Sequence, residues 1–166
     1  MRVDIWSDVV CPFCYIGKKR LEHVAEQAGI ELDIHWHSFE LDPNAPAKHD
    51  TSNTERLAQK YGRSYAEMEE MERNVAAMAA TEGIDFQWQK ANSGNSFNAH
   101  RIIHLAQSKG LGNEAKEAFF QAGYNEANMI DVVLVIGDKI ISNYIHNLTD
   151  FAIDFPIATP IEQELV

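Results

Sequence analysis

The alternation of apolar and polar residues predicts a strand, a helix and a second strand at the start of the chain. Residues 3–6 are mainly apolar and predict a short buried strand. Apolar positions at helical spacing follow and predict a helix that begins near residue 12 and stops at Gly29: Ile16, Leu21, Val24, Ala25 and Ala28. Residues 31–39 alternate, with Leu32, Ile34 and Trp36 on the buried side. A strand, a helix and a strand within 39 residues form a βαβ unit, so the two strands should be parallel.

Helical patterns dominate the middle of the chain, after a loop over residues 42–53. Four helices are expected there: 54–61, 64–83, 96–108 and 113–122. Ser64 and Glu67 have the spacing of a capping box, and Ser96 is expected to cap the third helix. A methionine stripe on the second helix is interpreted as core packing: Met68, Met71 and Met78. The pattern therefore predicts a helical insertion after the second strand.

The last third of the chain fits two patterns. Apolar residues between 130 and 148 recur at helical spacing, but residues 132–141 also read as a β-hairpin with a two-residue turn at Gly137-Asp138. The helix is favoured because its spacing continues to Leu148. Residues 151–166 contain Pro156 and Pro160 and are expected to form a tail along the surface.

Composition and charge limit the classes of function. The chain has 166 residues, of which 45% are apolar and 23% charged, as in an ordinary globular domain with a sizeable core. Its net charge of −11 disfavours nucleic acid and an anionic membrane surface as partners. We expect no signal peptide, because the N-terminus has no basic segment followed by an apolar run, and no membrane span. The expected location is the cytoplasm.

Both cysteines of the chain lie in one segment, Cys11-Pro12-Phe13-Cys14. Pro12 suits the first position of a helix, where the missing amide is not needed. A sulfur at a helix N-terminus meets free amides and partial positive charge, which favour the thiolate. Cys11 is therefore the candidate attacking thiolate, and Cys14, within the first turn, is the candidate resolving thiol. Nearby cations are expected to add a smaller effect: Lys18, Lys19 and Arg20.

Other interpretations of the dithiol remain open at this point. A zinc site needs about four ligands, so histidines would have to complete it. His100 and His104 have the spacing of two ligands on one helix, but neither is close to the dithiol in sequence. We expect no metal and no bound cofactor. His35 and His37 share one side of the second strand, which is interpreted as a solvated face, whereas Trp6 and Trp36 are expected in the core.

The segment 4–17, which contains the dithiol, resembles the opening of DsbA-family thioredoxin-fold oxidoreductases, in particular the FrnE-like branch. Segments 36–41 and 95–101 resemble the same branch, and the similarity covers about residues 1–118. The resemblance implies that Cys11 is the nucleophile, that Cys14 resolves, and that protein dithiols or disulfides are the clients, with no bound cofactor. The related 2-hydroxychromene-2-carboxylate isomerases use serine and glutathione, and the two cysteines here argue against that branch.

The C-terminal part departs from this family. No Val-Pro segment follows Phe120, although the family carries a cis-proline opposite its dithiol. Residues 119–157 instead resemble carboxymuconolactone decarboxylase and AhpD-like proteins, without their catalytic Glu-x-x-Cys-x-x-Cys-x-x-x-His motif. We therefore predict two parts, residues 1–118 and a helical segment 119–166.

The predicted fold class is α/β, with a thioredoxin-like βαβ start, a helical insertion, a mostly helical remainder and a truncated sheet. Two strands are too few for an independent sheet. Three outcomes are open: residues 132–141 add strands, the fold stays mostly helical with a truncated sheet, or a second copy completes the sheet. Self-association is therefore one hypothesis.

The sequence supports three hypotheses about function. The first is a thiol–disulfide oxidoreductase that acts on protein clients as oxidase, reductase or isomerase. The second is a weakly active or inactive remnant that serves binding or oligomerisation, with a Cys11 of ordinary pKa. The third is an AhpD-like peroxidase that uses the same dithiol.

Overall fold

The structure is a computed structural model that describes residues 1–91, 94–122 and 137. The predictions for residues 128–148 and for the tail lie almost wholly outside these residues. Gly137, the one described position there, is helical, the state that was favoured for it. The predicted division at residue 119 stays a prediction. No helix among the described residues is long and apolar enough to cross a membrane.

The chain begins with the predicted βαβ unit. Strand β1 (Arg2–Ser7) pairs in parallel with β2 (Asp33–Ser38), and α1 (Pro12–Gln27) connects them. The register places Ile5 opposite Trp36. Gly29 follows the end of α1 with φ of 65°, which glycine adopts without steric cost. Within the described residues the sheet has only these two strands.

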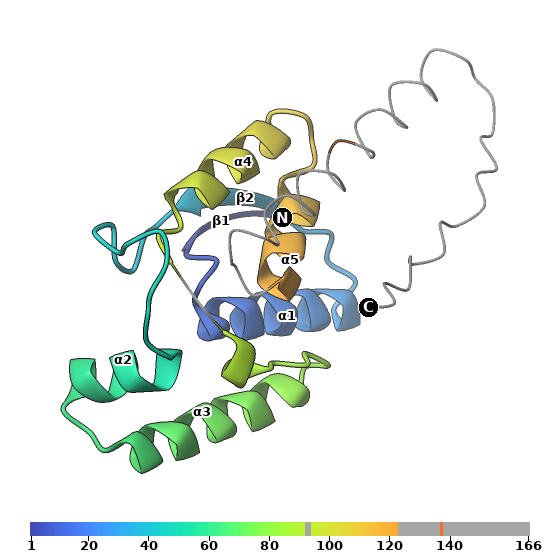
Figure 1. Cartoon of the computed structure of the whole chain (residues 1–166). Helices are drawn as coiled ribbons and strands as arrows, with labels where there is room; N and C mark the ends of the chain where they lie inside the picture. The colour runs from blue at the N-terminus through green and yellow to red at the C-terminus, as the bar shows by residue number, and fades with distance from the viewer. Residues whose placement is uncertain (92–93, 123–136, 138–166) are drawn as a thin grey trace, which may run out of the picture.

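Helices make up most of the rest, as predicted. They are α2 (Asn53–Tyr61), α3 (Tyr65–Ala80), the short 3₁₀ helix η1 (Trp88–Lys90), α4 (Phe97–Gln107) and α5 (Gly112–Ala122). Helices α4 and α5 pack on β2 and on each other, whereas the α2–α3 pair lies beyond α1, on the side away from the sheet (Figure 1). The insertion is thus a separate helical layer that covers one side of α1.

The helix starts explain why these boundaries occur. The predicted capping box at Ser64 and Glu67 is present, and a second box at Ser52 and Glu55 starts α2. Ser96 is the N-cap residue of α4, as predicted, but it does not cap the helix through its side chain. Its side chain makes no capping hydrogen bond, and Asn95 Oδ1 instead accepts the Phe97 amide at 3.0 Å. The Ser96 backbone, at φ −90° and ψ 0°, is not extended as a capping residue requires.

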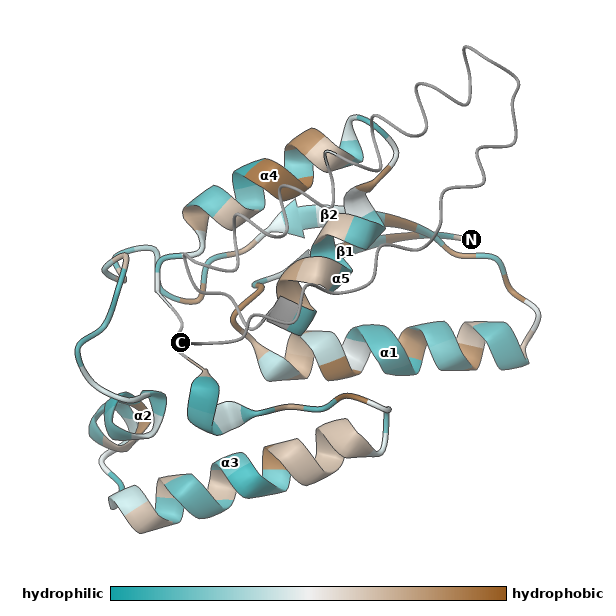
Figure 2. Ribbon diagram, turned by 45° about the vertical axis from the view of Figure 1, so that its right-hand side comes forward, coloured by the Kyte–Doolittle hydropathy of each residue, from teal (hydrophilic) through white to brown (hydrophobic). Residues whose placement is uncertain are grey.

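The core lies between the sheet, α1, α4 and α5. Trp36 is almost fully buried, with its ring edge toward Phe120 at 6.5 Å, and Phe120 stacks on Tyr15 at 4.8 Å. The other large buried core residues are Val9, Ile16, Val75, Ile84, Ile103, Leu111 and Phe119. Apolar and hydrophilic patches alternate along α1 and α4, as expected for helices with one buried side (Figure 2).

Two predictions of core packing are wrong. Trp6 is 62% exposed, because alternation along β1 turns it to the face opposite Ile5, where it stacks on His37 at 4.3 Å. That face is in contact with solvent, as predicted, since 34% of the His35 side chain and 37% of the His37 side chain are exposed. In the methionine stripe only Met68 is buried. Met71 and Met78 are exposed, because they lie beside the line of Met68, Val75 and Ala79 that faces the core.

Candidate functional site

The two cysteines lie at the open N-terminus of α1. Cys11 is the N-cap residue, with an extended backbone, and Pro12 occupies the first helical position as predicted. The Cys14 amide donates to the Cys11 carbonyl oxygen at 3.1 Å, which closes the first turn. Both thiols are free and partly buried. The helix start therefore brings the two side chains together at the carboxyl end of β1.

This arrangement divides the two thiols into a thiolate and a thiol. The pKa of Cys11 falls from 9.0 to about 6, chiefly because the Cys14 thiol donates a hydrogen bond to its sulfur. Burial and the Asp8 charge oppose this fall, while the amides of Cys14 and Phe13 support it. The pKa of Cys14 is raised, first by the same hydrogen bond and then by burial. Cys11 is therefore the more readily ionised of the two thiols, and Cys14 keeps its proton at neutral pH.

The cations expected to assist the dithiol are engaged elsewhere. Lys18 binds Glu22 at 2.7 Å and Glu117 at 2.6 Å, and Lys19 binds Glu117 at 2.7 Å. Arg20 binds Glu82 at 2.8 Å. Each of these positive charges faces a carboxylate, which weakens its effect at Cys11, and a contribution smaller than that of the helix end stays the prediction.

Lys116 of α5 is the cation that faces the dithiol. It is 1% exposed, its Nζ donates to the Ser7 carbonyl oxygen at 3.1 Å, and it lies 5.1 Å from the ring centres of Trp36 and Phe120. Burial lowers its pKa from 10.5 to about 8, against the opposing charges of Asp8 and the cysteines. Sequence reasoning missed it, although its spacing to Phe119 and Phe120 places it on the apolar side of α5.

Asp8 is a buried carboxylate three residues before Cys11. Its Oδ2 accepts the Leu41 amide at 2.7 Å, and its Oδ1 lies 3.4 Å from Nε2 of His100 in α4. Burial raises the pKa of Asp8, but the His100 imidazole, the Leu41 amide and the Ser96 side chain together lower it more, so the net shift is downward. Asp8 thus ties the β1–α1 loop to the segment after β2 and to α4. The sequence contained no signal for this role.

An open pocket of about 290 Å³ lies beside Cys14 at the free side of β1. Its lining is mainly apolar, and Trp6 and Phe13 are exposed on it. The remaining lining residues are Ile5, Ser7, Cys14, Gly17, Lys18 and Leu21. A short apolar segment of another chain could lie in this pocket, within reach of the dithiol.

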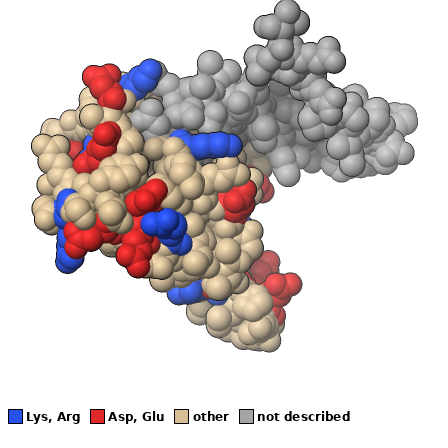
Figure 3. Space-filling view, turned by 60° about the horizontal axis from the view of Figure 1, so that its bottom comes forward, with Lys and Arg blue, Asp and Glu red and all other residues tan. Residues whose placement is uncertain are grey.

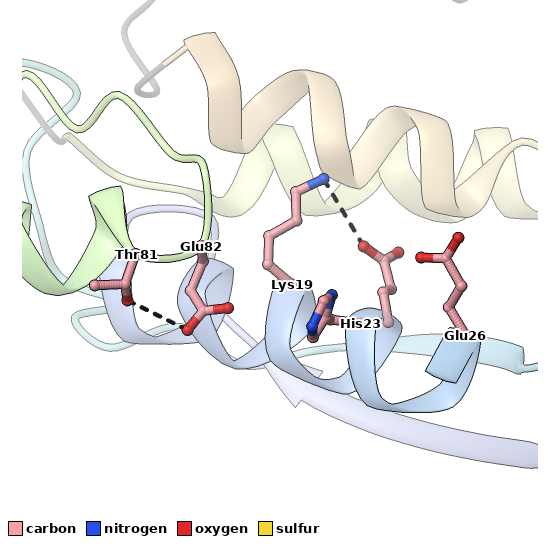
Figure 4. Close-up of a pocket in the computed structure, with 6 residues that line it drawn as sticks. Lys19, His23, Glu26, Thr81 and Glu82 are labelled. Carbon is pink, nitrogen blue, oxygen red and sulfur yellow. Dashed lines mark hydrogen bonds and ion pairs between the residues drawn. The ribbon is translucent and has the colours of Figure 1, made fainter. Parts of the chain in front are cut away.

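A second pocket, of about 320 Å³, lies further along α1 and contains no cysteine. Figure 4 shows Lys19, His23 and Glu26 of α1 on one side, with Thr81 and Glu82 from the end of α3 on the other. The lining is charged and its cations are paired, so we assign no chemistry to it.

The two histidines considered as metal ligands take separate partners. His100 faces Asp8, whereas His104 Nε2 hydrogen-bonds Ser38 Oγ at 2.7 Å. Over the described ranges, no three side chains of His, Cys, Asp and Glu gather in a way that could hold a metal ion.

Comparison with known proteins gives consistent matches. The model of a family described as the DSBA-like thioredoxin domain matches residues 2–134, and thus runs past residue 119, where the second resemblance was expected to begin. The uncharacterised protein YwbO of Bacillus subtilis (strain 168) is 23% identical over 144 residues. That alignment covers 84% of this chain, and the chain spans 66% of the length of that relative.

A solved structure is also similar. The crystal structure of the probable DsbA oxidoreductase SCO1869 from Streptomyces coelicolor superposes with a TM-score of 0.73 at 29% identity. The match covers 87% of this chain and 68% of that one.

Proposed function

The chain belongs to the DSBA-like thioredoxin domain family, and from this premise we propose that it is a thiol–disulfide oxidoreductase that works through Cys11 and Cys14. It has the fold of the family, here with a short two-stranded sheet and mostly helices. One observation carries the proposal. Cys11 lies at the open N-terminus of α1 with Cys14 in the following turn, and this arrangement lowers the pKa of Cys11 to about 6. The hypothesis of an inactive remnant expected an ordinary pKa for Cys11, and a pKa of about 6 argues against it.

The proposed reaction is two successive exchanges. The Cys11 thiolate attacks one sulfur of a client disulfide, the client S–S bond breaks, and one client sulfur leaves as a thiolate. Cys14 then loses its proton and attacks the Cys11 sulfur, which releases the second client thiol and leaves a Cys11–Cys14 disulfide. The client gains the two electrons that the dithiol loses. The same steps in reverse oxidise a client dithiol.

We propose protein chains as the clients, because the apolar pocket beside Cys14 suits an apolar peptide segment better than a small charged disulfide. Acidic and basic groups are interspersed on the face in Figure 3, and its described part carries no continuous basic patch for nucleic acid. The expected cytoplasmic location and the self-association stay predictions.

The test of the dithiol uses two serine variants and insulin as a disulfide-bonded client. Cys11→Ser should lose all exchange, because no nucleophile remains. Cys14→Ser should accumulate a covalent complex between Cys11 and the client, visible by electrophoresis without reductant, because nothing resolves it. Equal turnover in both variants and the unaltered protein would refute the proposal.

The test of the client class compares Trp6→Ala with Met71→Ala. Both remove an exposed apolar side chain, but only Trp6 lines the pocket beside Cys14. We expect Trp6→Ala to slow exchange with reduced, unfolded protein about tenfold, equivalent to a contact of about 1.4 kcal/mol, and to leave exchange with a small aromatic disulfide unchanged. Met71→Ala should leave both rates unchanged. Equal slowing of both substrates by Trp6→Ala would contradict a protein-binding pocket.

A further inference from the structure

The contact between His100 and Asp8 lies beside the dithiol and has no part in the exchange steps above. Both side chains are buried, His100 with 4% and Asp8 with 1% of its surface exposed. His100 lies in the first turn of α4, where its backbone amide donates a hydrogen bond to the Ser96 carbonyl oxygen at 3.1 Å. Its Nε2 makes no hydrogen bond within the described part of the chain, and it lies at ion-pair distance, 3.4 Å, from Asp8 Oδ1.

Asp8 connects this contact to the attacking sulfur. Its carboxylate lies in the loop that leads directly into the Cys11 N-cap, and its negative charge opposes ionisation of the Cys11 thiol. A cation that binds Asp8 therefore makes the Cys11 thiolate easier to form. Lys116 faces the same carboxylate from α5, and Cys11 faces it from the start of α1, whereas Cys14 interacts with the Asp8 backbone.

We propose, on the premise that the dithiol is the working site, that His100 is a positioning residue for Cys11. Its imidazolium binds the Asp8 carboxylate, which holds that carboxylate between the β1–α1 loop and α4 and reduces its repulsion of the Cys11 thiolate.

The test measures the rate of Cys11 alkylation by iodoacetamide against pH. His100→Gln keeps a hydrogen-bond donor of similar size but never carries a charge. We expect its alkylation profile to move to higher pH, with a rate near pH 6 about threefold below that of the unaltered protein. The matched control is His104→Gln, one turn further along α4 and exposed, whose profile should not move.

A second variant separates this electrostatic role from simple packing. In Asp8→Asn the negative charge is absent, so Cys11 should alkylate faster at acidic pH, and adding His100→Gln should change nothing further. If Asp8→Asn does not fold by circular dichroism, the His100→Gln profile alone decides. Identical profiles for His100→Gln and His104→Gln would overturn the inference. If instead the unaltered protein shows an acid-shifted alkylation profile but does not exchange with insulin, the proposed function is refuted. The two failures are therefore distinguishable.

Discussion

Two groups of buried charges lie where α5 packs near α1, and they differ in whether each cation is paired with a carboxylate. Along the middle of α1 Lys18 is nearly fully buried, and two carboxylates bind it: Glu22 and Glu117. At the N-terminal end Lys116 is equally buried, but it donates to a backbone carbonyl oxygen, and no carboxylate among the described residues lies within ion-pair distance of it. The first group satisfies its charges internally, whereas the second leaves a cation, a carboxylate and a thiolate next to each other.

The difference separates structure from chemistry. Paired charges at the middle of α1 hold α5 against α1, since Glu117 also accepts the Tyr15 hydroxyl at 2.6 Å. Incompletely paired charges near the dithiol cost folding free energy, and there the Cys14 hydrogen bond lowers the pKa of Cys11 while burial lowers the pKa of Lys116, so both values move toward neutrality. Buried charges that lack a full set of partners, beside residues with shifted pKa values, are typical of a reactive site.

The largest effect is expected at the dithiol. Cys14→Ala removes the hydrogen bond that contributes most to the low pKa of Cys11, so this pKa should rise from about 6 toward 9.0. The thiolate fraction near neutral pH should fall by roughly 100-fold. Cys14→Ser keeps a hydroxyl donor and should retain most of the shift. The measurement is the ultraviolet absorbance of the thiolate against pH, and similar curves for the two variants would contradict the assigned cause.

Lysine-to-methionine substitutions test the two groups directly. Lys18→Met leaves Glu22 and Glu117 with Lys19, which is less buried, as their remaining shared cation and should lower the free energy of unfolding by about 2 kcal/mol. Lys116→Met replaces an incompletely paired buried charge by an apolar side chain of similar length. It should raise the free energy of unfolding by about 1 kcal/mol, while Cys11 becomes less acidic.

Urea denaturation at neutral pH measures both lysine variants. The comparison between the two groups fails if both substitutions destabilise the protein equally, because Lys116 would then be a structural residue like Lys18.

The smallest effect concerns acid stability. Burial raises the pKa of Glu117, but hydrogen bonds from Lys18, Lys19 and Tyr15 together lower it by more. The net result is a fall from 4.5 to about 2. A carboxylate whose pKa is depressed in the folded state stabilises the fold above about pH 4.5 and loses that contribution as the pH falls to about 2.

Glu117→Gln should therefore be less stable than the unaltered protein at neutral pH, with the gap closing as the pH falls through this window. Thermal unfolding at several pH values measures the gap, and Glu114→Gln, exposed on the same helix, is the control. A gap that stays constant with pH would contradict the assigned ion pairs.

The βαβ start and most helix boundaries could be predicted from the sequence, because they depend on local patterns. Alternation over residues 31–39 predicted β2, and the serine–glutamate spacing predicted the start of α3. The position of Cys11 at the N-cap also followed from neighbouring residues, since Pro12 suits only the first turn of a helix.

Which charges meet the dithiol could not be predicted from local patterns, because it depends on how the helices pack. Lys116 donates to Ser7, which precedes it by 109 positions, and it reaches the site because α5 packs on the sheet. His100 reaches Asp8 in the same way, because α4 packs on β2. Long-range packing also brings Glu117 of α5 to Lys18 of α1, where the two form an ion pair. A pairing between side chains about a hundred residues apart depends on how the layers stack, and no periodicity within a single segment encodes that stacking.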